Sequence, residues 1–264
     1  WMRDQGILQD GMEQIAIGTN MFYPMSMGIR NYGYYNDEVD LKYVRYSQRF
    51  DKNWDYAVFP ARFIPPGELR SGAYPGSYAI KTFYVGDNPI GVILKKDKNS
   101  SITEAIRNMN SGSATAAIDG LRAELDRHPD NTEAYKYLGQ ALLNSGQVQP
   151  IPALMRQYRE YDPASATSYL YEGLAYMNMN QGSKALQALN AAQELNPGNS
   201  YVHFYKGNIY AATGNNIAAI ESYNRSIELN PRFRQAYVEA AKLYQKTGDT
   251  QRARQYRNAA NRLQ

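Results

Sequence analysis

The chain has 264 residues, of which 43% are hydrophobic and 20% charged, and its formal charge is +4. This composition is that of a folded protein with a core, and no run of about 18 apolar residues predicts a membrane span. The absence of cysteine excludes disulfides and cysteine-ligated metals. The two histidines, His128 and His203, lack metal-ligand spacing. Each imidazole is therefore expected to form its hydrogen bonds within the protein or to face solvent.

The chain begins Trp1-Met2-Arg3, without an initiator methionine or a signal segment. We therefore expect either that an upstream piece is removed or that the chain is part of a longer protein. Residues 1–97 carry equal numbers of acidic and basic side chains and are rich in Tyr, Gly and Pro. Residues 37–50 predict an amphipathic helix, because Val39, Tyr43, Tyr46 and Phe50 fall on one stripe.

Proline and glycine then mark a loop region. These residues are Pro60, Pro65, Pro66, Gly67, Gly72, Pro75 and Gly76. Residues 80–85 and 90–95 are rich in β-branched and aromatic side chains and flank Gly86-Asp87-Asn88-Pro89, which predicts a β-hairpin. Residues 1–97 are therefore expected to form a small α+β unit, joined to the rest of the chain through residues 97–101.

Carboxylates cluster in this first part of the chain, at Asp37, Glu38 and Asp40 and again at Asp51 and Asp55. No histidine, serine–histidine set or phosphate-binding glycine loop accompanies them. Acidic pairs on solvated helix faces are common, so we expect no catalytic site, no metal and no cofactor within this chain.

From about residue 98 the sequence repeats with a period of 34 residues. Four prolines mark the period, and four further registers hold small, aromatic or glycine residues at the same spacing. The prolines are Pro129, Pro163, Pro197 and Pro231. The registers are Ala105, Gly139, Gly173, Gly207 and Ala241; Leu142, Tyr176, Tyr210 and Tyr244; Gly112, Gly146, Asn180, Gly214 and Gly248; and Ala117, Ile151, Ala185, Ala219 and Ala253.

Each register has a physical reason. A glycine in mid-helix costs about 1 kcal/mol relative to alanine, which is tolerable where a second helix packs close. Glycine at the end of the first helix suits a left-handed cap, and a proline ends the second helix. The pattern resembles the tetratricopeptide repeat (TPR) family over roughly 167 of the 264 residues.

That resemblance implies a mostly α fold: a helix-turn-helix solenoid, wound as a right-handed superhelix and preceded by the small α+β unit. The five repeats are expected at residues 98–131, 132–165, 166–199, 200–233 and 234–264. Ser101 and Glu104 form a capping-box pattern at the first helix. In the second repeat Pro150 and Pro152 predict a longer loop between the helices. Glu172 and Lys206, one repeat apart, either pair or point to water.

In TPR proteins the first helix of each repeat lines a concave groove, and the resemblance implies that this groove binds a peptide. Either these side chains are open to a partner, or some of them pack against neighbouring helices or against residues 1–97. The residues expected in the groove are Lys136, Gln140, Asn144, Leu170, Leu174, Met177, Tyr201, Phe204, Asn208, Val238 and Lys242.

The last 33 residues hold eight basic side chains against two acidic ones, so the positive charge is a feature of this end and no nucleic-acid partner is expected. The basic residues are Arg232, Arg234, Lys242, Lys246, Arg252, Arg254, Arg257 and Arg262. Three interpretations stay open: a solvated polar cap, contact with an acidic protein surface, or attraction to anionic lipid beside a membrane protein.

A second resemblance concerns Asn53-Trp54-Asp55-Tyr56, Arg62-Phe63-Ile64-Pro65 and Leu69-Arg70-Ser71-Gly72. These stretches resemble the soluble tail of some bacterial multi-pass membrane glycosyltransferases, in which such a segment precedes TPR units. The resemblance implies a location at the extracytoplasmic face of a bacterial membrane, with transferase chemistry upstream of Trp1.

Two functions follow from these patterns. The first is a scaffold that binds a peptide or protein segment in the TPR groove. The alternative is an accessory tail of a membrane glycosyltransferase. The partner and the oligomeric state are not specified by the sequence.

Overall fold

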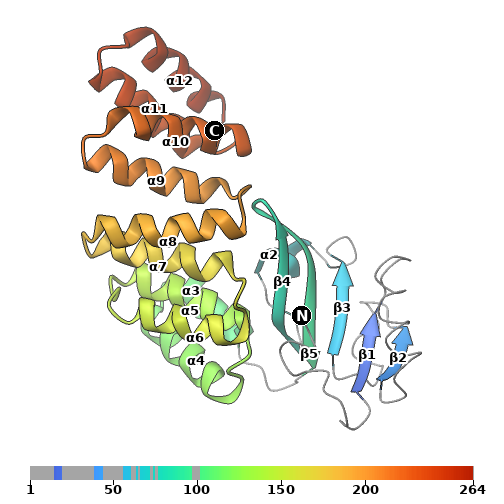
Figure 1. The fold of residues 1–264 in the computed structure, drawn as a ribbon. Helices are drawn as coiled ribbons and strands as arrows, with labels where there is room; N and C mark the ends of the chain where they lie inside the picture. Colours follow the sequence, from blue (N-terminus) through green and yellow to red (C-terminus); the bar gives the residue numbers. More distant parts are fainter. Residues whose placement is uncertain are drawn as a thin grey trace. The chain divides into compact units, whose positions relative to one another are not determined.

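The computed structural model describes residues 15–19, 39–43, 56–60, 64, 66–71, 74, 77–96 and 102–263, and for the first two segments the backbone alone. Its elements in chain order are shown in Figure 1. They are β1 (Ile15–Thr19), β2 (Val39–Tyr43), β3 (Tyr56–Pro60), α2 (Pro66–Ser71), β4 (Ser77–Val85), β5 (Asn88–Lys96), α3 (Ile102–Asn110), α4 (Ala114–Arg127), α5 (Thr132–Asn144), α6 (Ile151–Tyr161), α7 (Ala166–Asn178), α8 (Gly182–Leu195), α9 (Ser200–Ala212), α10 (Asn216–Leu229), α11 (Arg234–Lys246) and α12 (Thr250–Arg262).

The chain divides into two compact units. Unit 1 comprises Trp1–Tyr84, Pro89–Ser145 and Glu160–Pro163, and unit 2 comprises Val85–Asn88, Gly146–Arg159 and Ala164–Gln264. Most of both strands of the β4–β5 hairpin therefore belongs to unit 1, whereas the turn of the hairpin belongs to unit 2. Within the described residues the fold is mostly helical, and the predicted class, a helical solenoid preceded by a small unit with a β-hairpin, is confirmed.

Unit 1 contains a five-stranded mixed sheet in the order β2-β1-β3-β5-β4. Strand β1 pairs in parallel with β2 and with β3, and β3 pairs antiparallel with β5, with Phe59 opposite Val92. The predicted helix over residues 37–50 is wrong where the structure describes it, because residues 39–43 are β2. Their backbone pairs with β1, and pairing between distant strands outweighs a helical spacing of apolar residues. Residues 44–50 lie outside the described part, as do Asp37, Glu38, Asp51 and Asp55.

The core of this sheet is a cluster of buried apolar side chains. It consists of Phe59, Ile64, Tyr74, Ala79, Val92 and Leu94, with Leu69 of α2 packed against it. Helix α2 occupies part of the segment that was predicted to be a loop. Pro66 is its first residue and Glu68 lies in its first turn. Both positions favour a helix start, since proline has no N–H to leave unpaired and a carboxylate interacts favourably with the amino-terminal end.

The predicted hairpin is confirmed, and one side of it packs against the loop between α4 and α5. The Tyr78 hydroxyl donates to Asp130 Oδ1 over 2.9 Å, and Lys95 Nζ donates to Asp130 Oδ2 over 2.8 Å. The Thr132 hydroxyl donates to the carbonyl of Ala79 over 3.1 Å. These bonds satisfy polar groups that the packing takes out of water.

A second polar contact of unit 1 joins β4 to the residues that follow α6. Lys81 of β4 forms an ion pair with Asp162, and their side chains are 10% and 5% exposed. Two opposite charges buried to this extent depend on each other, because neither is solvated well enough to lose its partner at low cost.

The helices of the array come in pairs (Figure 1). Residues 179–181, 213–215 and 247–249 connect the pairs α7–α8, α9–α10 and α11–α12, whereas the longer segment 145–150 separates α5 from α6. The predicted longer loop is thus confirmed, and Pro152 is the second residue of α6, where a helix tolerates proline.

Two predictions made from the glycine registers are confirmed, one for glycines in mid-helix and one for glycines at helix ends. A Cβ atom built on Gly173 would lie 2.9 Å from Leu189, and one built on Gly207 would lie 2.6 Å from the ring of Tyr223. The second helix of each pair therefore approaches the glycine backbone directly. At the ends of the first helices, Gly214 and Gly248 have φ values of +80° and +89°, which glycine adopts readily.

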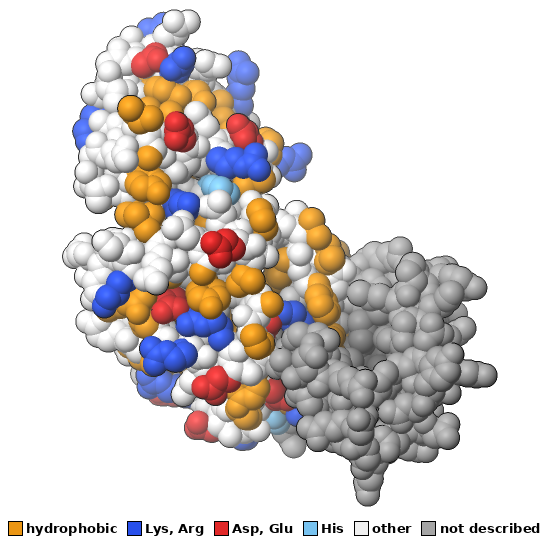
Figure 2. All heavy atoms as spheres, viewed as in Figure 1, with side chains coloured by type: hydrophobic (Ala, Val, Ile, Leu, Met, Phe, Trp, Pro, Cys, Tyr) orange, Lys and Arg blue, Asp and Glu red, His pale blue; other side chains and the backbone are white. Residues whose placement is uncertain are grey.

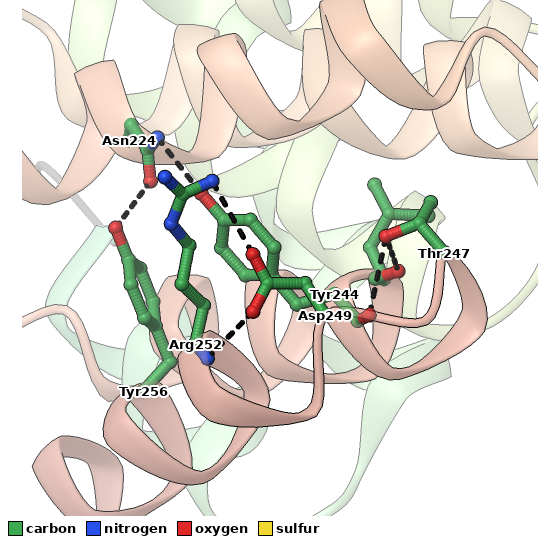
Figure 3. A network of polar contacts seen from close by, with 7 residues as sticks. Asn224, Tyr244, Thr247, Asp249, Arg252 and Tyr256 are labelled. Carbon is green, nitrogen blue, oxygen red and sulfur yellow. Dashed lines mark hydrogen bonds and ion pairs between the residues drawn. The ribbon is translucent and has the colours of Figure 1, made fainter.

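A polar network crosses from α10 to the last helix pair (Figure 3). The Tyr256 hydroxyl donates to Asn224 Oδ1 over 2.8 Å, and Asn224 Nδ2 donates to the Tyr244 hydroxyl over 3.5 Å. Asp249 accepts from the backbone N–H of Arg252 at the start of α12. Burial, followed by the neighbouring Tyr244, raises the pKa of Tyr256 to about 12, so its hydroxyl keeps its proton and acts as a donor at neutral pH.

Candidate peptide-binding surface

The first helices of the repeats begin at matching points because side chains cap them. Asn131, Ser165 and Asn199 accept hydrogen bonds from the backbone N–H groups of Ala134, Ser168 and Tyr201. Such caps satisfy N–H groups that have no partner within the helix. The same capping interaction, repeated along the chain, therefore determines where α5, α7 and α9 begin.

The three groove residues predicted on α5 belong to unit 1. Lys136 forms an ion pair with Glu133, and its ammonium group lies 5.0 Å from the ring centre of Tyr137. Gln140 and Asn144 are exposed. The charge of Lys136 is thus already matched within its own helix, while the two amides are open to solvent.

On α7 of unit 2, the predicted residues Leu170, Leu174 and Met177 are all half-buried. Leu170 and Met177 pack against the core cluster that contains Leu189 and Val202. Each of the three side chains is therefore partly buried and partly open to solvent.

Helix α9 carries the most exposed of the predicted aromatic residues. Tyr201 is 42% exposed, and its ring centre lies 4.9 Å from that of Phe233. Phe204 is only 7% exposed and belongs to the core cluster with Tyr223 and Tyr244. Asn208 accepts a hydrogen bond from the Tyr223 hydroxyl over 2.9 Å. The structure thus places Tyr201 at the surface and Phe204 in the interior.

The residue that sequence reasoning missed is Phe233, which precedes α11. Its ring lies 4.9 Å from that of Phe204 as well as from that of Tyr201. It lies in an inter-repeat turn, outside the helix positions that the family pattern assigns to the groove. Phe233 is the N-cap residue of α11 but makes no side-chain cap hydrogen bond. N-cap positions favour Ser, Asn or Asp, so an aromatic residue there was the feature of the sequence that could have indicated a role in packing.

On α11, Val238 is half-buried and Lys242 is exposed. The ammonium group of Lys242 lies 2.8 Å from Glu239 Oε1. The helices α7 and α9 contact each other, so their predicted residues lie on neighbouring elements of unit 2. Figure 2 shows hydrophobic side chains over the helical part, interspersed with charged ones on the face in view.

The pairing expected between Glu172 and Lys206 is wrong. Glu172 forms its ion pair with Arg159 over 2.8 Å, and the Arg159 guanidinium also lies 4.2 Å from the ring centre of Tyr169. Lys206 donates to Gln193 Oε1 over 2.8 Å. Each of the two side chains therefore pairs with a residue of the helix before its own, and not with the equivalent residue of the neighbouring repeat.

The described residues contain neither a cluster of metal ligands nor a helix that could span a membrane. No three His, Cys, Asp or Glu side chains gather there as a metal site requires. Every helix in that part of the chain is too short or too polar to cross a membrane. Burial lowers the pKa of His203, so this half-buried imidazole is neutral at neutral pH.

Two family models match parts of the chain, and both describe the same repeat. One, "Tetratricopeptide repeat", matches residues 102–149, and the other, "TPR repeat", matches residues 207–248. No curated protein matches the chain. The chain therefore contains TPR repeats, as its 34-residue period predicted.

Solved structures with a similar arrangement of helices include a TPR protein. TTC0263, a thermophilic TPR protein of Thermus thermophilus, has a TM-score of 0.54 at 21% identity, over 60% of this chain and 87% of that chain. A crystal structure of MamA has a TM-score of 0.51 at 24% identity, over 60% and 93%. MamA from Desulfovibrio magneticus RS-1, residues 41 to the end, has a TM-score of 0.51 at 18% identity, over 61% and 91%.

At these identities the likeness concerns the fold, which is a TPR solenoid. This fold is typical of protein–protein interaction scaffolds, because stacked repeats present an extended surface to a partner. The comparisons give no support to the resemblance to membrane glycosyltransferases.

Proposed function

We propose that the chain is an interaction scaffold that binds a peptide or protein segment on the surface of α7, α9 and α11 in unit 2. The observation that carries this proposal is Tyr201, a large aromatic side chain that is 42% exposed while its ring rests on Phe233. Aromatic residues dominate binding energy at interfaces. A ring already held in place loses little conformational freedom when a partner covers it.

The side chains predicted on α7 and α11 support an apolar or aromatic segment as the ligand. Leu174 and Met177 of the neighbouring α7 each leave part of their side chain outside the core. Asn178 and Lys242 are exposed polar groups on α7 and α11. An apolar centre with polar groups at its edge is the arrangement found in protein interfaces.

The basic side chains of residues 232–264 add a preference for acidic partners. Arg232, Arg234, Lys246, Arg254 and Arg262 are all exposed. Lys242 and Arg252, by contrast, are paired with Glu239 and Asp249. The exposed charges of this described segment would accelerate association with an acidic protein or with an anionic membrane surface, and high salt would weaken that effect.

The test is to select ligands from a displayed peptide library on the full chain and to measure their affinities for two variants. Tyr201→Ala removes the proposed anchor and should weaken binding by about tenfold or more, which corresponds to about 1.4 kcal/mol or more. Ile217→Ala is the matched control, because Ile217 is 75% exposed on α10, a second helix of a repeat. Equal affinities for wild type and Tyr201→Ala would overturn the proposal, and circular dichroism verifies that both variants are folded.

A further inference from the structure

The turn of the β4–β5 hairpin contacts the loop between α8 and α9 within unit 2. Asn196 Nδ2 donates to the carbonyl of Gly86 over 2.8 Å. The backbone N–H of Ser200 donates to Asp87 Oδ1 over 2.9 Å, and the Ser200 hydroxyl donates to Asp87 Oδ2. Both oxygens of the carboxylate and one backbone carbonyl of the turn are thus bound by side chains and backbone more than a hundred residues away in sequence.

Glycine on both sides makes this contact possible. A Cβ atom on Gly86 would lie 3.0 Å from the carbonyl oxygen of Gly198, and one on Gly198 would lie 3.1 Å from the Cα of Gly86. Gly86 also has a φ of +59°, which other residues adopt at a cost. A side chain at Gly86 would therefore require the loop to shift by a few tenths of an ångström, so the contact favours glycine at this position.

The carboxylate of Asp87 lies where a negative charge is most favourable. Ser200 is the first residue of the 13-residue helix α9, so its N–H has no acceptor within the helix. The positive end of the helix dipole attracts an anion at this point. Asn199 caps the N–H of Tyr201, so Asp87 supplements the local cap by binding a different N–H group. Hydrogen bonds to a charged acceptor are about twice as strong as those between neutral groups.

The three contacting residues occur together at one inter-repeat loop. One and two periods earlier, the positions of Asn196, Gly198 and Ser200 hold Asp162, Ala164 and Ala166, and His128, Asp130 and Thr132. One period later they hold Asn230, Arg232 and Arg234. The combination is therefore not part of the repeat pattern, and the helix fold does not require it.

We propose that Asn196, Gly198 and Ser200 form a binding site for a β-turn that carries glycine followed by aspartate, and that this chain fills the site with its own Gly86–Asp87 turn. The Gly86–Asp87 turn is then an intrachain ligand of this site. A Gly-Asp turn of a partner protein would compete with it for the same three residues. Ser200 adjoins Tyr201 at the start of α9, but this proposal uses different residues from the surface around Tyr201 and does not rest on the function proposed for that surface.

The experiment uses the full chain and a fluorescent peptide of residues 82–91 that is closed by a terminal disulfide, with binding followed by fluorescence polarisation. Asp87→Asn removes the charge of the intrachain ligand and should increase the affinity for the peptide at least about tenfold over wild type. Adding Ser200→Ala to that variant should abolish the gain. A peptide with asparagine in place of its aspartate should bind no variant. Asn88→Ala, an exposed neighbour in the same turn, is the matched control and should behave as wild type.

Equal peptide affinities for wild type and Asp87→Asn, or no binding to folded Asp87→Asn, would overturn the proposal. Should Asp87→Asn not fold, Gly86→Ala takes its place. Its Cβ atom crowds the carbonyl oxygen of Gly198 and strains the positive φ, which weakens the contact of the turn. Asn196, Gly198 and Ser200 are unchanged, so a gain in affinity for the peptide is expected here too. A folded Gly86→Ala variant that does not bind the peptide would contradict the proposal equally.

Discussion

At Gly207, in the middle of α9, the backbone lies so close to the buried ring of Tyr223 that no side-chain atom fits between them. The ring cannot move away easily, because its hydroxyl donates to Asn208 on the same helix as the glycine. Gly120, in the middle of α4, has a different environment. A Cβ atom there would meet only the methyl group of Ala105 at 3.6 Å, an ordinary contact distance.

The two glycines should therefore respond oppositely to alanine. Gly207→Ala is expected to lower the free energy of unfolding by about 1–3 kcal/mol through overpacking, less a partial gain in helix propensity. Gly120→Ala should raise it by about 0.5–1 kcal/mol. Urea unfolding followed by circular dichroism measures both. A stabilised Gly207→Ala variant would show that the close approach to Tyr223 does not exist in solution.

Residue-scale reasoning from sequence succeeded where the cause is local. The glycine registers predicted both the close helix crossing at Gly173 and Gly207 and the left-handed caps at Gly214 and Gly248. Tyr201 and Phe204 could not be told apart in this way. Both rings contact Phe233, which lies in a turn about thirty residues later in the chain.

At the scale of elements, strand β4 is held to the residues after α6 by the buried pair of Lys81 and Asp162. Asp162→Ala removes the carboxylate that pairs with the buried ammonium group, and we expect a loss of about 3–5 kcal/mol in the free energy of unfolding. The double variant Lys81→Met, Asp162→Leu should lie close to wild type, because it removes both charges and keeps apolar volume.

The matched control for this prediction is Glu228→Ala. This substitution breaks the ion pair between Arg225 and Glu228, whose side chains are 52% and 63% exposed, respectively. It should change the free energy of unfolding by about 1 kcal/mol at most. Chemical denaturation compares all variants under one set of conditions. An Asp162→Ala variant that loses no more stability than Glu228→Ala would show that water reaches the Lys81–Asp162 pair.

The elements of the sheet were predicted less completely than those of the array. The hairpin was found because its turn residues and its two strands are neighbours in sequence. The helix expected over residues 37–50 was not found at residues 39–43, which form β2 and pair with β1, more than twenty residues away. A stripe of apolar residues is compatible with both structures, and only the partner strand decides between them. Helix α2 was missed because its prolines and glycines were read as loop signals, whereas Pro66 begins the helix.

At the scale of the whole molecule, a repeat array is stabilised mainly by contacts between neighbouring helices. Helix α12 buries only two small residues completely, Ala253 and Ala260. Helix α8, in contrast, buries Leu189 together with three alanines. Apolar burial therefore stabilises α12 less than α8, although the Tyr256 hydrogen bond partly compensates.

Amide hydrogen exchange should reveal this difference between α8 and α12. We expect the backbone N–H groups of α12 to exchange at least about tenfold faster than those of α8, because less apolar area must be exposed to open the last helix. Mass spectrometry of peptides from the two helices measures the difference in one experiment. Equal protection of α12 and α8 would mean that unit 2 opens only as a single cooperative body.

The solenoid itself could be predicted from the sequence because each repeat obtains its structure from its own residues and from its neighbours, so a 34-residue period contains nearly all the necessary information. The contacts of the hairpin were not predicted. They join Asp130 to Tyr78 and Lys95, and Ser200 to Asp87, and no periodicity links these residues.

The contact between Asp87 and Ser200 has a consequence for how the chain is made. These residues are 113 positions apart, and contacts between distant residues slow folding because the intervening chain must be closed into a loop. Helix pairs of the array can form as they leave the ribosome, since their contacts are local. The hairpin turn, synthesised long before its binding loop, has to wait until more than a hundred further residues have been translated.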